Sequence, residues 1–127
     1  MSPRTSQRIA IEAAIDSAEG PVSPAEVLES ARRSVPTISL ATVYRTLKRM
    51  LEDGEISMVV LAGQSPRYER AQIAREHHHH FLCKNCDTVY DLDGCVEGLR
   101  KLLPRGFQMT EHEITISGQC RACRQAS

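Results

Sequence analysis

The sequence predicts an α+β protein, with an N-terminal winged helix-turn-helix followed by a small α/β domain that carries a structural zinc site. Two observations support this prediction. Three helical segments precede a β-rich hairpin within residues 1–70, and two Cys-x-x-Cys pairs and a run of four histidines lie within residues 77–127. Residues 71–76 are interpreted as a linker or hinge between these parts. A length of 127 residues suits one ordinary domain or two very small ones.

The first part of the chain contains three segments with helical signals. Residues 4–18 place apolar side chains at helical spacing, and Gly20-Pro21 ends that helix. Ser23-Pro24-Ala25-Glu26 is a capping box with proline at the first helical position, which predicts a second helix over 24–33. Ser39 can cap a third helix that runs to about Leu51, with Gly54 at its C-terminal end.

The segments that follow favour strands. Residues 56–61 are rich in β-formers, and a turn at 63–66 leads into Arg67-Tyr68-Glu69, which predicts a hairpin. Three helices followed by a hairpin describe a winged helix-turn-helix. Beyond the linker we expect strands over 78–83 and 88–92, a short helix over 94–103 and an alternating strand over 107–117.

Composition limits the possible classes of protein. With 41% hydrophobic and 25% charged residues the chain is typical of a globular protein, and no apolar run approaches the roughly 20 residues that span a bilayer. The N-terminal segment is amphipathic and has no signal-peptide pattern, so we expect a cytoplasmic protein. The 16 basic and 16 acidic residues balance. Bulk charge therefore gives no support to nucleic-acid binding, which must rest on local placement.

The cysteine pattern is the strongest chemical signal in the sequence. Cys83-x-x-Cys86 is followed, after 33 intervening residues, by Cys120-x-x-Cys123. Four thiolates close tetrahedrally around Zn²⁺ and leave no open position, which indicates a structural site. Two redox pairs or unligated thiols are the alternative. Cys95 is left over and is interpreted as an ordinary small apolar residue.

Four consecutive histidines, His77 to His80, precede the first cysteine pair. In an extended segment alternate side chains point to opposite faces, so His77 pairs with His79 and His78 with His80. Each pair could serve a different metal site, because imidazole with carboxylate suits Zn, Fe(II), Mn and Ni. A solvated polar loop is the alternative. Further candidate ligands are Glu69, Asp91, Glu97 and His112, of which His112 could instead be a hydrogen-bonded core histidine.

The third helical segment carries a candidate DNA-binding face. Its apolar residues lie on one face of the helix, and the other side chains point away from that face. Tyrosine offers a ring for a thymine methyl group, while arginine and lysine reach phosphates or guanine edges. A charged helix face is often simply solvated, but the place of this helix before a wing favours DNA. The outward residues are Thr42, Tyr44, Arg45, Lys48 and Arg49.

The order of these motifs resembles the ferric uptake regulator family of metal-dependent repressors. The matching stretches are Ala41-Thr42-Val43-Tyr44-Arg45, the run from His77 to His80 with Cys83-x-x-Cys86, and Cys120-x-x-Cys123. The resemblance implies a homodimer with an N-terminal DNA-binding domain and a zinc-stabilised dimerisation domain over 77–127. It also implies that metal binding draws two winged helices into the spacing of a palindromic operator, in control of metal homeostasis or metal-linked stress genes.

The resemblance assigns roles to individual residues. It implies structural Zn²⁺ at Cys83, Cys86, Cys120 and Cys123. It implies a regulatory Fe²⁺, Mn²⁺, Zn²⁺ or Ni²⁺ at Glu69, His78 and His80. The stretch between Glu69 and the histidine run is slightly long, and Asp91 is the alternative carboxylate for this site. An additional metal site is implied at His77, His79, Glu97 and His112. The DNA contacts are expected from Arg4, Ser39, Thr42, Tyr44, Arg45 and Lys48.

Two other classes of function are alternatives to this one. A zinc-stabilised interaction module would have the cysteines without metal sensing. A metal-dependent hydrolase needs an open coordination position and a general base, and the sequence contains no His-Glu-x-x-His pattern. A hydrolase would also have no use for a winged helix. We therefore expect no enzymatic activity. Gly20-Pro21-Val22 stands where many iron and peroxide sensors resembling this chain have a histidine, which speaks against peroxide sensing.

Overall fold

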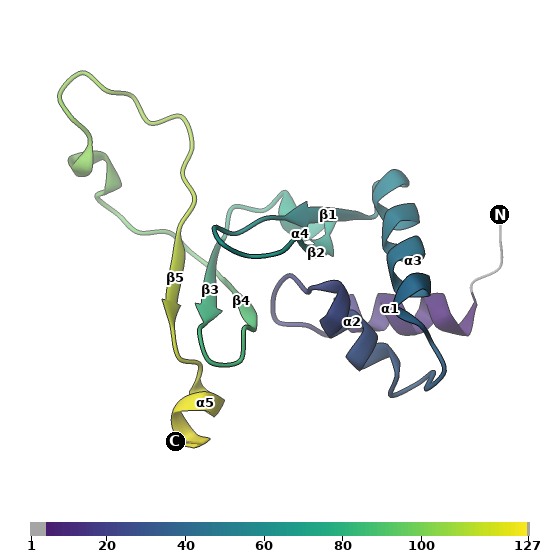
Figure 1. Ribbon diagram of the computed structural model, residues 1–127. Coiled ribbons are helices and arrows are strands. Elements are labelled where there is room, and N and C mark those ends of the chain that lie inside the picture. The colour runs from purple at the N-terminus through teal and green to yellow at the C-terminus, as the bar shows by residue number, and fades with distance from the viewer. Residues whose placement is uncertain (1–4, 127) are drawn as a thin grey trace. The chain divides into compact units, whose positions relative to one another are not determined.

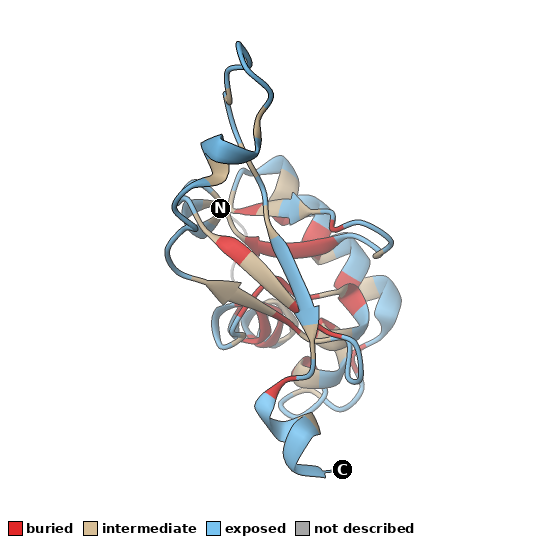
Figure 2. Cartoon of the chain, turned by 90° about the vertical axis from the view of Figure 1, so that its left-hand side faces the viewer, coloured by how far each residue is buried: buried red, intermediate tan, exposed pale blue. Residues whose placement is uncertain are grey.

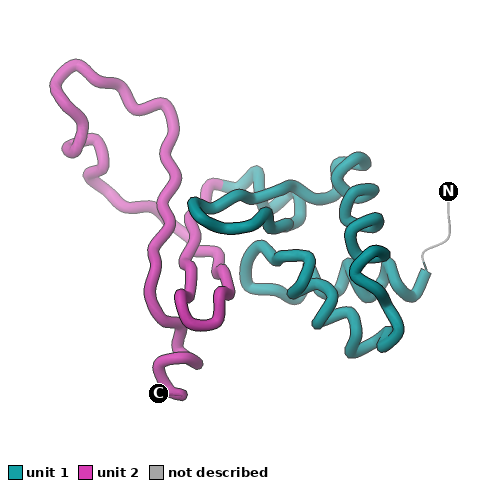
Figure 3. The backbone as a smooth tube through the Cα atoms, in the orientation of Figure 1, with its two compact units in different colours: residues 1–76 teal, residues 77–127 magenta. Residues whose placement is uncertain are grey.

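The computed structural model describes residues 5–126 and divides into two compact units. Unit 1 comprises Met1–Glu76 and unit 2 comprises His77–Ser127 (Figure 3). Among the described residues, no helix is both long enough and apolar enough to cross a membrane.

Unit 1 begins with three helices (Figure 1). These are α1 (Ser6–Asp16), α2 (Pro24–Ala31) and α3 (Leu40–Glu52). Each begins at a hydroxyl side chain that accepts a backbone N–H of the first turn, which satisfies a donor that the helix itself leaves unpaired. The caps are Thr5, Ser23 and Ser39, and the predicted capping box of Ser23 and Glu26 is present.

A two-stranded antiparallel hairpin follows the helices. It consists of β1 (Ile56–Val59) and β2 (Arg67–Arg70), and Val22 adds an isolated bridge to Tyr68. The first strand is shorter than the predicted span of 56–61. The predicted linker also contains structure, because α4 (Ala71–Ala74) follows β2 directly and the Ala71 N–H donates to the Glu55 carbonyl. Residues 71–76 thus belong to unit 1.

The main hydrophobic cluster among the described residues is formed by unit 1, and Figure 2 shows the buried segments of the chain in red. Two ion pairs, one of them partly buried and one exposed, join the hairpin to the helices. Arg67 is almost fully buried and its Nη1 lies 2.5 Å from a carboxylate oxygen of Glu26, and Arg70 holds Asp16 with two hydrogen bonds of 2.6 and 3.0 Å. The side chains buried most deeply in this core are Ile11, Val27, Ile38, Val43, Leu47 and Met50.

Unit 2 is built around a three-stranded sheet with the order β4-β3-β5. Its strands are β3 (His79–Cys83), β4 (Val89–Leu92) and β5 (Thr115–Gly118). Strand β3 pairs antiparallel with β4 and parallel with β5. A helix at the C-terminal end, α5 (Arg121–Ala126), was not predicted.

Two expectations for unit 2 were wrong. The helix expected over 94–103 is reduced to a single 3₁₀ turn, η1 (Leu99–Leu102). Gly94 and Gly98 have φ angles of +93° and +86°, a left-handed conformation that an α-helix does not tolerate. The strand expected over 107–117 is reduced to β5, so His112 lies outside any strand and strand alternation does not apply to it.

Candidate metal centres and DNA-binding face

Four cysteines meet at one end of the unit 2 sheet. Cys83 ends β3, Cys86 lies in the turn before β4, Cys120 precedes α5 and Cys123 lies on its first turns. The Sγ atoms of Cys83 and Cys123 are 3.6 Å apart, those of Cys86 and Cys120 are 3.9 Å apart, and all four lie within 4.8 Å of one another. A tetrahedral zinc with bonds near 2.3 Å separates its sulfur ligands by about 3.8 Å. The cluster therefore has the dimensions of a Cys₄ zinc site.

Backbone groups prepare this cluster for a cation. N–H groups of Cys86, Cys120 and Asn85 donate to the Cys83 sulfur, and together they lower the pKa of Cys83 to about 6. The pKa of Cys120 is also lowered, first by the Cys123 backbone, whereas hydrogen bonding to Cys120 and Cys83 raises the pKa of Cys123 to about 12. Backbone donors thus favour the thiolate form of Cys83 and Cys120, which is the form that binds zinc. All five cysteines of the chain are free thiols, which leaves the four available as ligands.

Two histidines and one carboxylate form a second cluster in unit 2. The register of β3 and β4 places His80 directly opposite Asp91, and residues opposite each other share a face of the sheet. The Nε2 atoms of His78 and His80 lie 3.3 and 3.4 Å from the same oxygen, Oδ1 of Asp91. Burial and the neighbouring His78 lower the pKa of His80, so its ring is kept in the neutral form that binds metals. Burial raises the pKa of Asp91, so the carboxylate gains from a nearby cation.

The remaining predicted regulatory ligand, Glu69, lies in unit 1. It is on β2 and is paired in register with Ser57. The sequence left open whether Glu69 or Asp91 completes this site, and the structure brings Asp91 to the two histidines within unit 2. The role of Glu69 stays a prediction.

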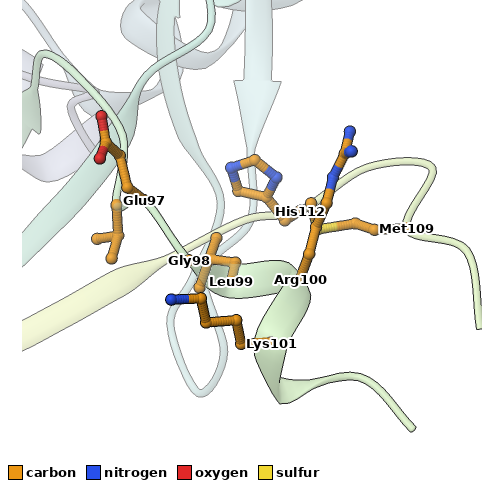
Figure 4. Close-up of a pocket in the computed structure, with 8 residues that line it drawn as sticks. Glu97, Gly98, Leu99, Arg100, Lys101, Met109 and His112 are labelled. Atoms are coloured by element: carbon orange, nitrogen blue, oxygen red, sulfur yellow. The ribbon is translucent and has the colours of Figure 1, made fainter. Parts of the chain in front are cut away.

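A third cluster lies in unit 2 and differs from expectation in one member. It contains His77, His79 and His112 as predicted, with Cys95 in place of Glu97. The Cys95 sulfur lies 2.9 Å from Nε2 of His112 and 3.4 Å from Nε2 of His79. Glu97 is exposed at the rim of an adjacent pocket of about 330 Å³, and Figure 4 shows its carboxylate turned away from the His112 ring. The interpretation of Cys95 as an ordinary apolar residue missed this contact.

The four histidines group as strand alternation predicts. The rings of His78 and His80 are 4.9 Å apart at their centroids, and those of His77 and His79 are 4.8 Å apart. The ring of His112 joins the second pair at 4.8 Å from His77 and 5.1 Å from His79. Two metal-ligating groups of different composition therefore lie on either side of one short segment.

The outer face of α3 is exposed, as the sequence predicts. Val43, Leu47 and Met50 are buried, and this fixes the rotation of the helix in unit 1. Tyr44 is 52% exposed, and Arg45, Lys48 and Arg49 are exposed as well. The exposed side chains combine one aromatic ring with three cations, a composition suited to bases and phosphates.

Hydrogen bonds order the N-terminal turn of this helix. Ser39 accepts the Thr42 N–H at 3.2 Å and contacts the Thr42 hydroxyl, which in turn accepts a hydrogen bond of 3.1 Å from Arg45. Ser39 and Thr42 thus hold the start of α3 and the Arg45 guanidinium. Arg49 pairs with Asp53 at 3.3 Å on the last turn. Arg4, the expected minor-groove residue, lies outside the described residues.

Comparison with known proteins agrees with this arrangement. The sequence model of the ferric uptake regulator family matches residues 3–117. The ferric uptake regulation protein of Bacillus subtilis (strain 168) is 29% identical over 94% of this chain and 83% of its own length. The peroxide-responsive repressor of Staphylococcus epidermidis (strain ATCC 12228 / FDA PCI 1200) is 27% identical over 95% of this chain and 81% of its own length.

A solved structure shows the same fold. A zinc-bound manganese uptake regulator superposes with a TM-score of 0.79 at 26% identity, and the match covers 94% of this chain and 91% of that one. The family match spans both units and includes α3, the histidine run and the first cysteine pair. The chain belongs to the ferric uptake regulator family, whose members are metal-responsive transcriptional regulators.

Proposed function

We propose that this metal-responsive repressor senses its metal through His78, His80 and Asp91, with Glu69 as the ligand from unit 1. The observation that carries the proposal is the convergence of both Nε2 atoms on one oxygen of Asp91, at 3.3 and 3.4 Å. Imidazole nitrogens beside a carboxylate can bind a divalent cation, and this ligand set suits Fe²⁺, Mn²⁺, Zn²⁺ and Ni²⁺. The relatives named for ferric and manganese uptake support a metal from this group.

The Cys₄ cluster has a different role in this proposal. Its four thiolates would hold Zn²⁺ with no open position, which supports a structural ion and not a sensed one. The hydrophobic core cluster of the described residues spans residues 10–68, all within unit 1. The buried apolar residues described in unit 2 are few, among them Leu82 and Val89, and small domains of this kind are commonly stabilised by a metal.

The sensing step follows from which unit supplies each ligand. An ion bound by Glu69 of unit 1 and by the three unit 2 residues would restrict the motion of one unit relative to the other. Metal binding then shifts the population toward the orientation that engages DNA, because a ligand favours the state to which it binds more tightly. Regulators of this family act as DNA-binding dimers, and we propose that the operator is palindromic to match the two-fold axis.

Titration of DNA binding with Fe(II), Mn(II), Zn(II) and Ni(II) tests this proposal. The zinc content of the purified chain must be measured in the same samples, because the structural ion should be present before any titration. Binding that rises with one of these ions at constant structural zinc supports a separate sensing site.

Two substitutions on α3 should separate base reading from phosphate binding. Tyr44→Ala should reduce discrimination between operator and non-specific DNA by about 1–3 kcal/mol, because the exposed ring is placed to contact bases. Arg45→Ala should weaken binding to all sequences. It should also reduce the slope of log affinity against log salt concentration by about 1. Fluorescence anisotropy with operator and scrambled duplexes at several salt concentrations measures both effects.

The matched control for these variants is Arg105→Ala, which removes a positive charge from an exposed position in unit 2. It should leave affinity and salt dependence unchanged. If Tyr44→Ala and Arg45→Ala behave as this control does, α3 is not the recognition helix.

A further inference from the structure

We propose that Cys95 is a metal ligand, which completes a His₃Cys site with His77, His79 and His112 for a zinc-like ion. One nitrogen of each of the three rings and the Cys95 sulfur all lie within 4.8 Å of one another. All four residues belong to unit 2, so the site is contained within one compact body. This inference does not depend on DNA binding or on the sensing role of His78 and His80.

The distances around Cys95 fit coordination by sulfur and nitrogen. A tetrahedral zinc with bonds near 2.3 Å to sulfur and 2.0–2.1 Å to nitrogen separates such a pair by about 3.6 Å. The sulfur of Cys95 lies 3.4 Å from Nε2 of His79, close to this value, and 2.9 Å from Nε2 of His112. Binding of an ion would therefore require the distance between the Cys95 sulfur and the His112 nitrogen to increase, by less than about 1 Å. Cys95 lies on an exposed segment between β4 and η1, which allows that adjustment.

The chemistry of the four ligands distinguishes this cluster from the one at Asp91. A thiolate with imidazoles favours a borderline ion such as Zn²⁺, whereas carboxylate with imidazoles also accepts Fe²⁺ and Mn²⁺. On binding, a bond forms between the ion and the Cys95 sulfur, and the thiol proton leaves to solvent. The segment at 77–80 would thus supply ligands to two sites with different metal preferences.

His79 must lose an existing hydrogen bond before it can bind an ion at Nε2 as a neutral ring. Its Nδ1 accepts a hydrogen bond of 3.2 Å from the Ile114 N–H, so the neutral ring carries its proton on Nε2, facing Cys95. An ion bound at Nε2 must displace the proton there. If the ring stays neutral, its proton moves to Nδ1, and Nδ1 can then no longer accept the hydrogen bond from the Ile114 N–H. We therefore expect this site to bind its ion more weakly than the Cys₄ cluster and to exchange it more readily.

Cobalt(II) provides a direct probe, because a thiolate bound to cobalt gives a sulfur-to-metal charge-transfer band in the near ultraviolet. The full chain, with zinc retained in the Cys₄ cluster, is titrated with Co(II) without oxygen, and its zinc content is measured before and after. The wild type should gain the band without losing zinc. Cys95→Ser should lose the band and keep the same zinc content, and added Zn(II) should remove the band from the wild type where Mn(II) does not.

Glu97→Gln is the matched control, because Glu97 is the carboxylate that the sequence placed in this site. It should behave as the wild type does. His112→Ala should lose the band, which provides a second variant at a different ligand. A band that survives both Cys95→Ser and His112→Ala at constant zinc, or a wild type with no band, would overturn the proposal.

Discussion

Replacing His78 and His80 together with alanine should abolish metal-dependent DNA binding and leave a folded chain that retains its zinc. The two side chains supply both nitrogens that converge on Asp91, so the double variant leaves only carboxylates for the sensed ion. Coupling between an effector and a second ligand is commonly about 1–3 kcal/mol, or roughly 5- to 150-fold in affinity. In the double variant, metal should no longer increase the affinity for DNA. A titration with metal should leave the affinity at its metal-free level.

The matched comparison is His77→Ala with His79→Ala, which removes two histidines from the same run. These residues contact His112 and not Asp91, so the variant should lower the metal response but retain it. The sensing assignment is wrong if the two double variants respond alike, or if the loss is greater for His77 and His79. Circular dichroism and zinc analysis of both variants establish that the fold and the structural ion are retained.

Cys83→Ser should release the structural zinc and unfold unit 2. Cys83 is fully buried, and it accepts hydrogen bonds from backbone N–H groups that lower its pKa. Structural zinc in small domains contributes roughly 10–16 kcal/mol of apparent binding free energy, which is as large as the whole stability of a typical domain. Zinc content after gel filtration and thermal unfolding followed by circular dichroism measure the effect.

Lys84→Ser provides the control for this variant, since it introduces the same side chain at an exposed position in the same turn. It should retain zinc and its unfolding temperature. A Cys83→Ser chain with full zinc content and unchanged stability would contradict the Cys₄ assignment.

The sequence predicted unit 1 well because its signals are local. The capping box at Ser23 and Glu26 and the spacing of Val43, Leu47 and Met50 depend only on neighbouring residues. The grouping of the four histidines also followed from local geometry, since side chains alternate along an extended segment. The Cys-x-x-Cys pairs were equally clear because the spacing itself is diagnostic of a metal site.

The parts that the sequence left open or missed depend on contacts between distant segments. The sequence named Asp91 only as an alternative to Glu69, because the register between β3 and β4 that places Asp91 opposite His80 is specified by no local pattern. Cys95 was passed over because a single cysteine without a partner at fixed spacing has no motif, and its contacts with His79 and His112 are made across a loop. The helix expected over 94–103 had suitable side chains, but Gly94 and Gly98 adopt left-handed conformations that interrupt it.

Selection from a pool of random-sequence duplex DNA tests the central claim most directly. The zinc-loaded full chain is used with no second metal and, in parallel, with Fe(II) under anaerobic conditions, Mn(II), Zn(II) or Ni(II). We predict that a palindromic sequence is enriched with at least one of these ions and that no sequence is enriched without them. Equal enrichment with and without the second metal, or no enrichment under any condition, would contradict the assignment of this chain as a metal-dependent DNA-binding repressor.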